Sequence, residues 1–208
     1  WDDINMIVHA LQQAIMRLRY SSVPVVTAPY GLTLGGGCEI AIHGNRVRAA
    51  AETYIGLVEV GVGVIPAGGG TKEMTMRAMD AAGKAPDADP LTFLKKTFEM
   101  IGMGKVATSA QEARSWGFFR DVDSISMNGD RLIADAKQEV LNLAASGFTA
   151  PVPRDDVRVM GEAGEAAMKL ALHMMKRGGF ISEHDELIGT KLAHVMSGGS
   201  MNHPAFVS

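Results

Sequence analysis

The sequence predicts an α/β fold, because short segments of high β-propensity alternate with segments that suit helices. The first strands are expected at residues 23–28 and 47–50, on either side of a short helix at 36–43. The composition agrees, since 47% of the 208 residues are hydrophobic and 21% are charged. A chain of this length and composition can bury a sizeable core as one domain, or as one domain with an appendage.

Longer helices are expected at both ends of the chain. The first is predicted to run from an N-cap at Asp2 or Asp3 to about Tyr20. Its apolar face consists of Ile4, Ile7, Val8, Leu11, Ile15 and Leu18. Thr71 is expected to open another helix. Further helices are predicted at 91–103, 130–145, 162–176 and 182–196, with a loop at 83–90, a capping-box pair of Ser109 and Glu112, and a linker at 148–156.

The most informative motif is the run from Gly31 to Glu39, in which three consecutive glycines follow a predicted strand and precede a helix. Glycines let another group approach the main chain, and the first N–H groups of a helix have no partner within it. Such a corner can bind an anion or a developing oxyanion, and Glu39 lies where it can transfer a proton. The alternative is a tight turn followed by a surface glutamate.

A second glycine-rich stretch, residues 56–71, contains another carboxylate, that of Glu59. Glu59 is the only charged residue between Glu52 and Lys72, and it is surrounded by Val, Ile and Gly. Burial in such surroundings disfavours the charged form of a carboxyl group. If Glu59 converges with Glu39, the two like charges move their pKa values apart, as suits an acid and a base at neutral pH.

These two stretches resemble the signature motifs of the crotonase superfamily, which comprises the enoyl-CoA hydratases and isomerases. The family patterns are approximately A-L-G-G-G-C-E-L-A and P-E-x-x-L-G-x-x-P-G-x-G-G-T. Residues 108–118 are similar to the family's S-A-x-E-A-x-x-x-G-L segment. Residues 51–59 and 181–185 resemble one subgroup, the hydratase part of bacterial fused 3-hydroxyacyl-CoA dehydrogenase/enoyl-CoA hydratase proteins of fatty-acid β-oxidation.

The resemblance implies the crotonase-like spiral of ββα units, with a partial core at 1–148 and a helical lid and oligomerisation region at 149–208. It also implies a homo-oligomer of the trimer type. The family segment that supplies a second oxyanion donor and most of the adenine contacts has no match before the first helix. The chain is therefore expected to be a fragment without the family's first strands, and to be catalytically poor alone.

The resemblance also implies the site residues. Glu39 and Glu59 match the two catalytic glutamates, and Gly36 matches the glycine whose N–H forms half of the oxyanion hole. The residues expected to contact substrate are Leu34, Gly35, Gly37, Pro66 and Ala67. The chain departs from the family pattern at three positions, with Val58 in place of the usual Pro, Ala67 in place of a Gly, and Asn45 in place of an Asp.

The activity that the resemblance implies is the hydration of a trans-2-enoyl-CoA to the 3-hydroxyacyl-CoA. Glu39 acts as base on a water, and Glu59 delivers a proton to the α carbon. The substrate is a coenzyme A thioester, and NAD is expected only for a separate dehydrogenase part. One alternative is a Δ3,Δ2-enoyl-CoA isomerase, which would use chiefly Glu59, so the presence of Glu39 favours the hydratase. The other alternative is a non-catalytic core with only a subunit-contact role.

Other classes of function find less support. A formal net charge of -3 provides no basic stripe for nucleic acid. No metal site is predicted, because no pair among His173, His184 and His194 has the i, i+4 spacing of a helical zinc site. The chain shows no apolar run of about twenty residues and no signal peptide, and a cytoplasmic location is expected.

Three remaining features have structural interpretations. The stretch Gly61 to Gly63 is an incomplete dinucleotide fingerprint. Cys38 is predicted to be a small packed side chain and not a nucleophile, because no partner base is evident. The methionines are expected to fill the core, the alternative being that some of them line an acyl tunnel: Met74, Met76, Met100 and Met103.

Overall fold

The computed structural model describes residues 1–85 and 87–207, and it confirms the predicted α/β class. Its internal contacts divide the chain into two compact units. The first unit contains residues 1–57, 67–70 and 106–153, and the second contains 58–66, 71–105 and 154–208. The predicted division at residue 148, the lid and the trimerisation region stay predictions.

The first unit is built on parallel strands. Its largest sheet has the order β1-β3-β5 and is parallel throughout, with Val26 opposite Arg46 and Ala49 opposite Ile125. A second parallel pair joins β2 to β4. The elements are α1 (Asp2–Arg19), β1 (Val26–Thr27), β2 (Leu32–Leu34), α2 (Gly36–Ile42), β3 (Arg46–Ala50), β4 (Tyr54–Gly56), α5 (Ala110–Ser115), β5 (Ser124–Ser126), the 3-10 turn η2 (Gly129–Arg131) and α6 (Leu132–Ala145).

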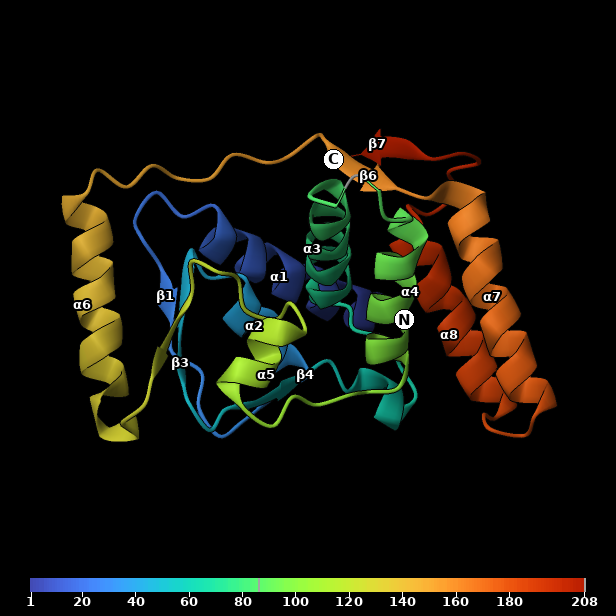
Figure 1. Ribbon diagram of the computed structural model, residues 1–208, viewed down its shortest axis with the longest axis horizontal. Coiled ribbons are helices and arrows are strands. Elements are labelled where there is room, and N and C mark those ends of the chain that lie inside the picture. Colours follow the sequence, from blue (N-terminus) through green and yellow to red (C-terminus); the bar gives the residue numbers. More distant parts are fainter. Residues whose placement is uncertain (86, 208) are drawn as a thin grey trace. The chain divides into compact units, whose positions relative to one another are not determined.

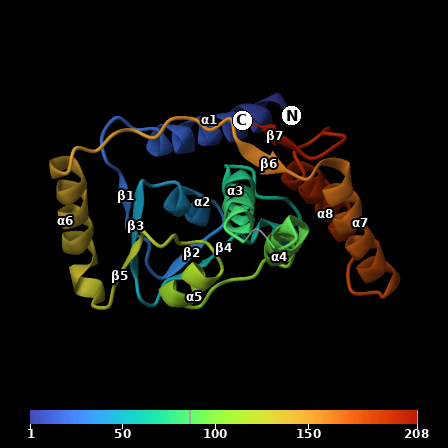
Figure 2. The same cartoon turned by 45° about the horizontal axis from the view of Figure 1, so that its top comes forward.

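Helices cover the β1-β3-β5 sheet on both faces, with α6 on one side and α2 on the other (Figure 1 and Figure 2). A parallel sheet that is covered in this way has apolar residues on both faces. The core accordingly takes side chains from strands and helices alike, among them the fully buried Ile42, Val47, Ala49, Ile55, Leu57 and Phe118.

The second unit is mainly helical. Its elements are the 3-10 turn η1 (Glu59–Val62), α3 (Gly70–Gly83, apart from its first residue), α4 (Pro90–Gly102), β6 (Val157–Val159), α7 (Gly161–Arg177), α8 (Glu183–Met196) and β7 (Ala205–Val207). Helices α7 and α8 lie side by side, and α4 packs against both of them (Figure 1). Strands β6 and β7 form an antiparallel pair.

Helix capping differs from the expectation in two places. The N-cap of α1 is Trp1 and makes no side-chain hydrogen bond, so the prediction of an Asp2 or Asp3 cap is wrong; both acids lie in the first turn, where negative charge suits the helix dipole. Ser109 caps α5 as expected, but the Glu112 carboxylate accepts from the backbone N–H of Thr108, one residue before the capping-box position. A complete capping box forms instead at the start of α8.

Two apolar segments differ from what their patterns suggest: the face of α1 is more exposed, and the strand expected at 23–28 is shorter. On the predicted face of α1, Ile15 is buried, whereas Ile4 is 57% exposed and Ile7 is 65% exposed. The strand expected at 23–28 shortens to β1, because Pro24 has no N–H and the N–H of Val25 donates to the Asn45 side chain.

Candidate active site

The glycine-rich corner of the first unit joins β2 to α2. The N–H of Gly35 donates to the carbonyl of Gly56 on the neighbouring strand at 2.9 Å, and Gly35 then turns the chain with a φ of 56°. A residue with a side chain rarely adopts such an angle. Gly36 and Gly37, the first two residues of α2, are exposed, and a Cβ added to either would meet nothing within 4 Å. The backbone is therefore open to another group at this corner.

Glu39 lies on the first turn of α2 and is only 2% exposed, so the alternative of a surface glutamate is wrong. Its Oε1 accepts a hydrogen bond from the backbone N–H of Gly70 at 2.8 Å. Burial raises the pKa of Glu39, and the backbone N–H groups of Gly70, Gly68 and Gly69 oppose part of that rise. The net effect is a carboxyl group that binds its proton more tightly than an exposed glutamate does.

The second glycine motif forms a cradle around this carboxylate. A Cβ on Gly70 would lie 2.7 Å from Leu57 Cδ2 and 2.9 Å from Glu39 Cγ, and a Cβ on Gly68 would overlap the Glu39 carboxylate itself. Gln12 of α1 holds the same loop, because its Nε2 donates to the carbonyl of Ala67 at 2.7 Å. Gly68 and Gly70 are therefore required by the volume that Glu39 occupies, whereas a Cβ on Gly69 would meet His43 at 3.3 Å.

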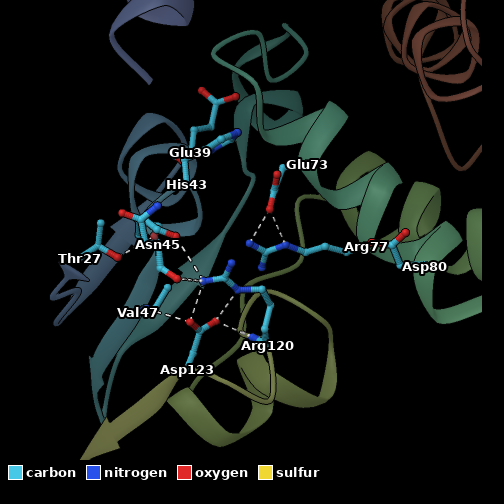
Figure 3. A network of polar contacts seen from close by, with 12 residues as sticks. Thr27, Glu39, His43, Asn45, Val47, Glu73, Arg77, Asp80, Arg120 and Asp123 are labelled. Atoms are coloured by element: carbon cyan, nitrogen blue, oxygen red, sulfur yellow. Dashed lines mark hydrogen bonds and ion pairs between the residues drawn. The ribbon is translucent and has the colours of Figure 1, made fainter. Parts of the chain in front are cut away.

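A buried histidine at the C-cap of α2 contacts the backbone of Glu39 (Figure 3). His43 is fully buried, and its Nδ1 lies 2.7 Å from the backbone carbonyl of Glu39, one helical turn before it. A carbonyl can only accept, so Nδ1 donates the proton in this contact. His43 was not among the predicted site residues, although its i, i+4 spacing from Glu39 was a usable signal.

Polar contacts also fix the chain after α2 (Figure 3). Asn45 uses both ends of its amide, accepting from Val25 N at 2.7 Å and donating to the Arg19 carbonyl at 3.2 Å. The buried Asp123 accepts from the N–H of Val47 at 2.9 Å and pairs with Arg120. An aspartate at position 45 would lack the N–H group that donates to the Arg19 carbonyl.

Glu59 belongs to the second unit, where it is the first residue of η1 and is half-buried. The turn ends at Gly63, which has a φ of 83°, and the Nε2 of His184 lies 2.7 Å from the Gly63 carbonyl. Helix α8 thus holds the end of the turn that contains Glu59. The convergence of Glu39 and Glu59 stays a prediction.

The remaining predicted substrate contacts also stay predictions. Leu34 is the half-buried last residue of β2. Pro66 is buried, and its carbonyl accepts from the Thr71 hydroxyl inside the first turn of α3. Ala67 is exposed, and no described residue other than glycine has a positive φ, so its backbone suits a residue with a side chain.

The structure places the other candidates as follows. Among the described residues no cluster of His, Cys, Asp and Glu could hold a metal ion. His173 and His194 face Glu186 and Glu165 separately. Cys38 is fully buried. Met74, Met76 and Met100 are buried core residues, whereas Met103 is 53% exposed. Within the described part of the chain, no helix is long and apolar enough to span a membrane.

Comparison with known proteins identifies relatives for nearly the whole chain, although no protein-family model matches it. The probable 3-hydroxyacyl-CoA dehydrogenase of Bacillus subtilis is 44% identical over 199 residues, which are 96% of this chain and 24% of that protein. A putative fatty acid oxidation complex trifunctional enzyme of Rickettsia felis is 30% identical over 152 residues, 73% of this chain and 19% of that protein. The chain thus spans about a quarter or less of the length of these two relatives.

Solved structures agree on the fold. An enoyl-CoA hydratase from Bacillus anthracis matches with a TM-score of 0.54 and 22% identity, covering 94% of this chain and 62% of that one. A putative enoyl-CoA hydratase from Thermobifida fusca, solved in complex with CoA, matches with a TM-score of 0.53 and 15% identity, covering 93% of this chain and 62% of that one. The fold is the crotonase fold. The chain belongs to the crotonase superfamily of enoyl-CoA hydratases and isomerases.

Proposed function

We propose that this chain is the hydratase part of an enzyme that adds water to trans-2-enoyl-CoA thioesters. The observation that supports this most is the environment of Glu39, which is buried beside an open glycine corner and accepts from the N–H of Gly70. A carboxylate whose pKa is raised is a stronger base when it is ionised, and burial raises the pKa of Glu39.

In the proposed reaction the thioester oxygen accepts a hydrogen bond from the N–H of Gly36, which stabilises the enolate charge where it develops. Glu39 removes a proton from the attacking water, whose oxygen bonds to the β carbon. Glu59 gives a proton to the α carbon. One proton leaves water as another arrives on carbon, so two carboxyl groups in opposite protonation states suit the reaction.

The hydratase is favoured over the isomerase by the same environment. An isomerase shuttles one proton and needs chiefly the Glu59 position, whereas here Glu39 is held by the glycines that follow Ala67.

The names of the two sequence relatives support a place for this chain within a larger fatty-acid oxidation enzyme. We propose that the parent protein also oxidises the 3-hydroxyacyl-CoA product with NAD on a separate part, and that it works in fatty-acid β-oxidation in the cytoplasm as a homo-oligomer.

The test is hydration of crotonyl-CoA by the intact parent protein, followed as loss of the enoyl-thioester absorbance. We expect Glu39→Gln and Glu59→Gln each to lower the rate by about 100-fold to 10,000-fold, the usual contribution of a positioned acid or base. Glu52→Gln is the matched control, since Glu52 is an exposed glutamate of the first unit. Near-normal turnover in either site variant would remove that residue from the mechanism.

A further inference from the structure

One side chain contacts both the helix that carries Glu39 and the glycine loop that surrounds its carboxylate. That side chain is His43, the C-cap residue of α2, which is fully buried. Glu39 and His43 are four positions apart, so they lie on the same face of the helix, one turn from each other. The proposed reaction gives this imidazole no role.

The His43 residue closes the end of α2. The last carbonyl groups of a helix have no N–H partner within it. Here the N–H of His43 donates to the Ile40 carbonyl at 3.3 Å, and its Nδ1 donates to the Glu39 carbonyl at 2.7 Å. The hydroxyl of Thr27 donates to the Ala41 carbonyl at 2.7 Å. His43 thus uses both its backbone and its side chain to hold the last turn of the helix.

The edge of the His43 ring lies against the glycine loop 68–70. A Cβ on Gly69 would come within 3.3 Å of both Cε1 and Nε2 of His43. The glycines on either side of Gly69 face Glu39 instead. A Cβ on Gly70 would lie 2.9 Å from Glu39 Cγ, and a Cβ on Gly68 would overlap the Glu39 carboxylate. The middle glycine therefore packs on His43, while its two neighbours pack on Glu39.

These contacts connect the position of the Glu39 carboxylate to the imidazole. Figure 3 shows both side chains on α2. The N–H of Gly70 donates to Glu39 Oε1 at 2.8 Å, and this bond needs a fixed spacing between the helix and the loop. The bond from Nδ1 fixes the helix, and the ring edge contacts the loop. A shift of about 1 Å in a reacting group can lower a rate about 100-fold.

We propose that His43 is a positioning residue for Glu39: its Nδ1–H holds the Glu39 backbone, so that the carboxylate stays within reach of the Gly70 N–H during turnover. The inference rests on the proposed function for the role of Glu39 as the base. His43 acts only through Glu39 and the loop 68–70, and it makes no contact with the water or the thioester in this role.

Two kinds of substitution separate the hydrogen bond from the bulk of the ring. His43→Asn keeps an N–H donor at the place of Nδ1 but lacks the ring edge that meets Gly69. His43→Met fills the space with a flexible side chain that cannot donate. His43→Leu is made alongside, so that the result does not depend on one apolar variant folding. Thr27→Val is the matched control, because it removes a donor to a different carbonyl at the same end of α2.

The first experiment measures kcat and KM for crotonyl-CoA with the intact parent protein, relative to the amount of folded protein. We expect kcat to fall about tenfold or more in His43→Met and His43→Leu, while KM changes less than about threefold. His43→Asn should keep kcat within about threefold of the wild type. Thr27→Val should leave kcat unchanged. A residue that only stabilised the fold would change the amount of folded protein and not its kcat.

The second experiment does not need turnover, because it follows the unfolding free energy as a function of pH. Burial raises the pKa of Glu39, and the N–H groups of Gly70, Gly68 and Gly69 lower it. If the carboxylate moves away from the loop, this lowering is lost and the pKa rises further. The fall of the unfolding free energy with increasing pH should then extend to higher pH in His43→Met than in the wild type. Glu39→Gln identifies the contribution of Glu39, and Thr27→Val should behave as the wild type does.

Two results would overturn the inference. One is a wild-type kcat in His43→Met and His43→Leu. The other is a tenfold loss of kcat in His43→Asn, which would assign the effect to the volume or the charge of the ring and not to its hydrogen bond. A parent protein that hydrates no enoyl-CoA, but whose unfolding shows the extended fall in His43→Met, would refute the proposed hydration while supporting the role of His43.

Discussion

The backbone N–H of Gly70 donates to the Oε1 of Glu39 at 2.8 Å, although the two residues are 31 positions apart in the chain. This bond joins the two glycine-rich motifs within one unit. The second motif therefore has a structural role that is independent of Glu59, because its glycines surround the carboxylate of Glu39. The position of the Glu39 carboxylate therefore depends on Gly68 and Gly70, which leave room for it because they have no side chain.

The first prediction concerns this packing. Gly70→Ala should destabilise the protein by about 1–3 kcal/mol, because its Cβ would press on Leu57 and Glu39 and force them to move. Activity should fall as well, since the Glu39 carboxylate is displaced. Denaturant unfolding measures the stability. Gly83→Ala, at the open end of the same helix, is the control, and equal unfolding free energies for the two variants would contradict the packing argument.

The second prediction concerns the pH dependence of hydration. Glu39 must be ionised to act as a base, and burial raises its pKa above the ordinary value of 4.5. The rate should therefore increase with pH through an apparent pKa above that value. A profile of kcat/KM against pH measures it. An acidic limb at or below 4.5 would show that the group responsible is not the buried Glu39.

The third prediction concerns stability as a function of pH. A carboxyl group whose pKa is raised by folding favours the folded state when it is protonated. Its contribution is fully present below the pKa of the unfolded chain and is lost as pH rises through the raised value. Glu39→Gln should remove this component, so its unfolding free energy should fall less steeply between these two pKa values. If the unfolding free energies of the wild type and of Glu39→Gln depend on pH in parallel, Glu39 is not the group responsible.

The fourth prediction concerns Asn45. Asn45→Asp should cost about 1–3 kcal/mol, because the hydrogen bond from the Asn45 amide to the Arg19 carbonyl is lost and a charge is placed in a buried position. Thermal unfolding measures the loss. Asn142→Asp is the matched control, since Asn142 is exposed and only its Oδ1 is used, as an acceptor from Gln138. A melting temperature that falls equally in both variants would contradict the role given to the Asn45 amide.

The fifth prediction concerns His184 as a positioning residue for Glu59. His184→Ala should change stability by less than about 1.5 kcal/mol, because the bond is exposed, yet kcat should fall while KM for crotonyl-CoA changes little. His184→Gln can still donate to the Gly63 carbonyl and should restore part of kcat. His173→Ala, another exposed histidine of this unit, is the control. An unchanged kcat in His184→Ala would remove this role.

Local patterns predicted the glycine-rich corner at 31–39 well. The helix expected at 36–43 is observed as Gly36–Ile42, and three glycines before a carboxylate were sufficient to place it. The strand expected at 23–28 was overestimated, because the side chain that takes the N–H of Val25 comes from residue 45. Tertiary contacts of this kind are absent from any local window of sequence.

The same limit applies to the site. The pattern around 68–70 predicted a turn, but the identity of the group inside that turn, the Glu39 carboxylate, depends on packing across 31 residues. The chemistry of a site residue was predictable where a single motif contains that residue. The packing of distant segments around the residue was not.

The central claim is that Glu39 and Glu59 act together on one substrate. A crystal structure of the intact parent protein with butyryl-CoA bound tests this most directly. We expect both carboxylates to face the thioester, within hydrogen-bond reach, roughly 2.6–3.2 Å, of one water beside the β carbon. We also expect the thioester oxygen to accept from the N–H of Gly36. Carboxylates on opposite sides of the protein, or a thioester bound away from Gly36, would contradict it.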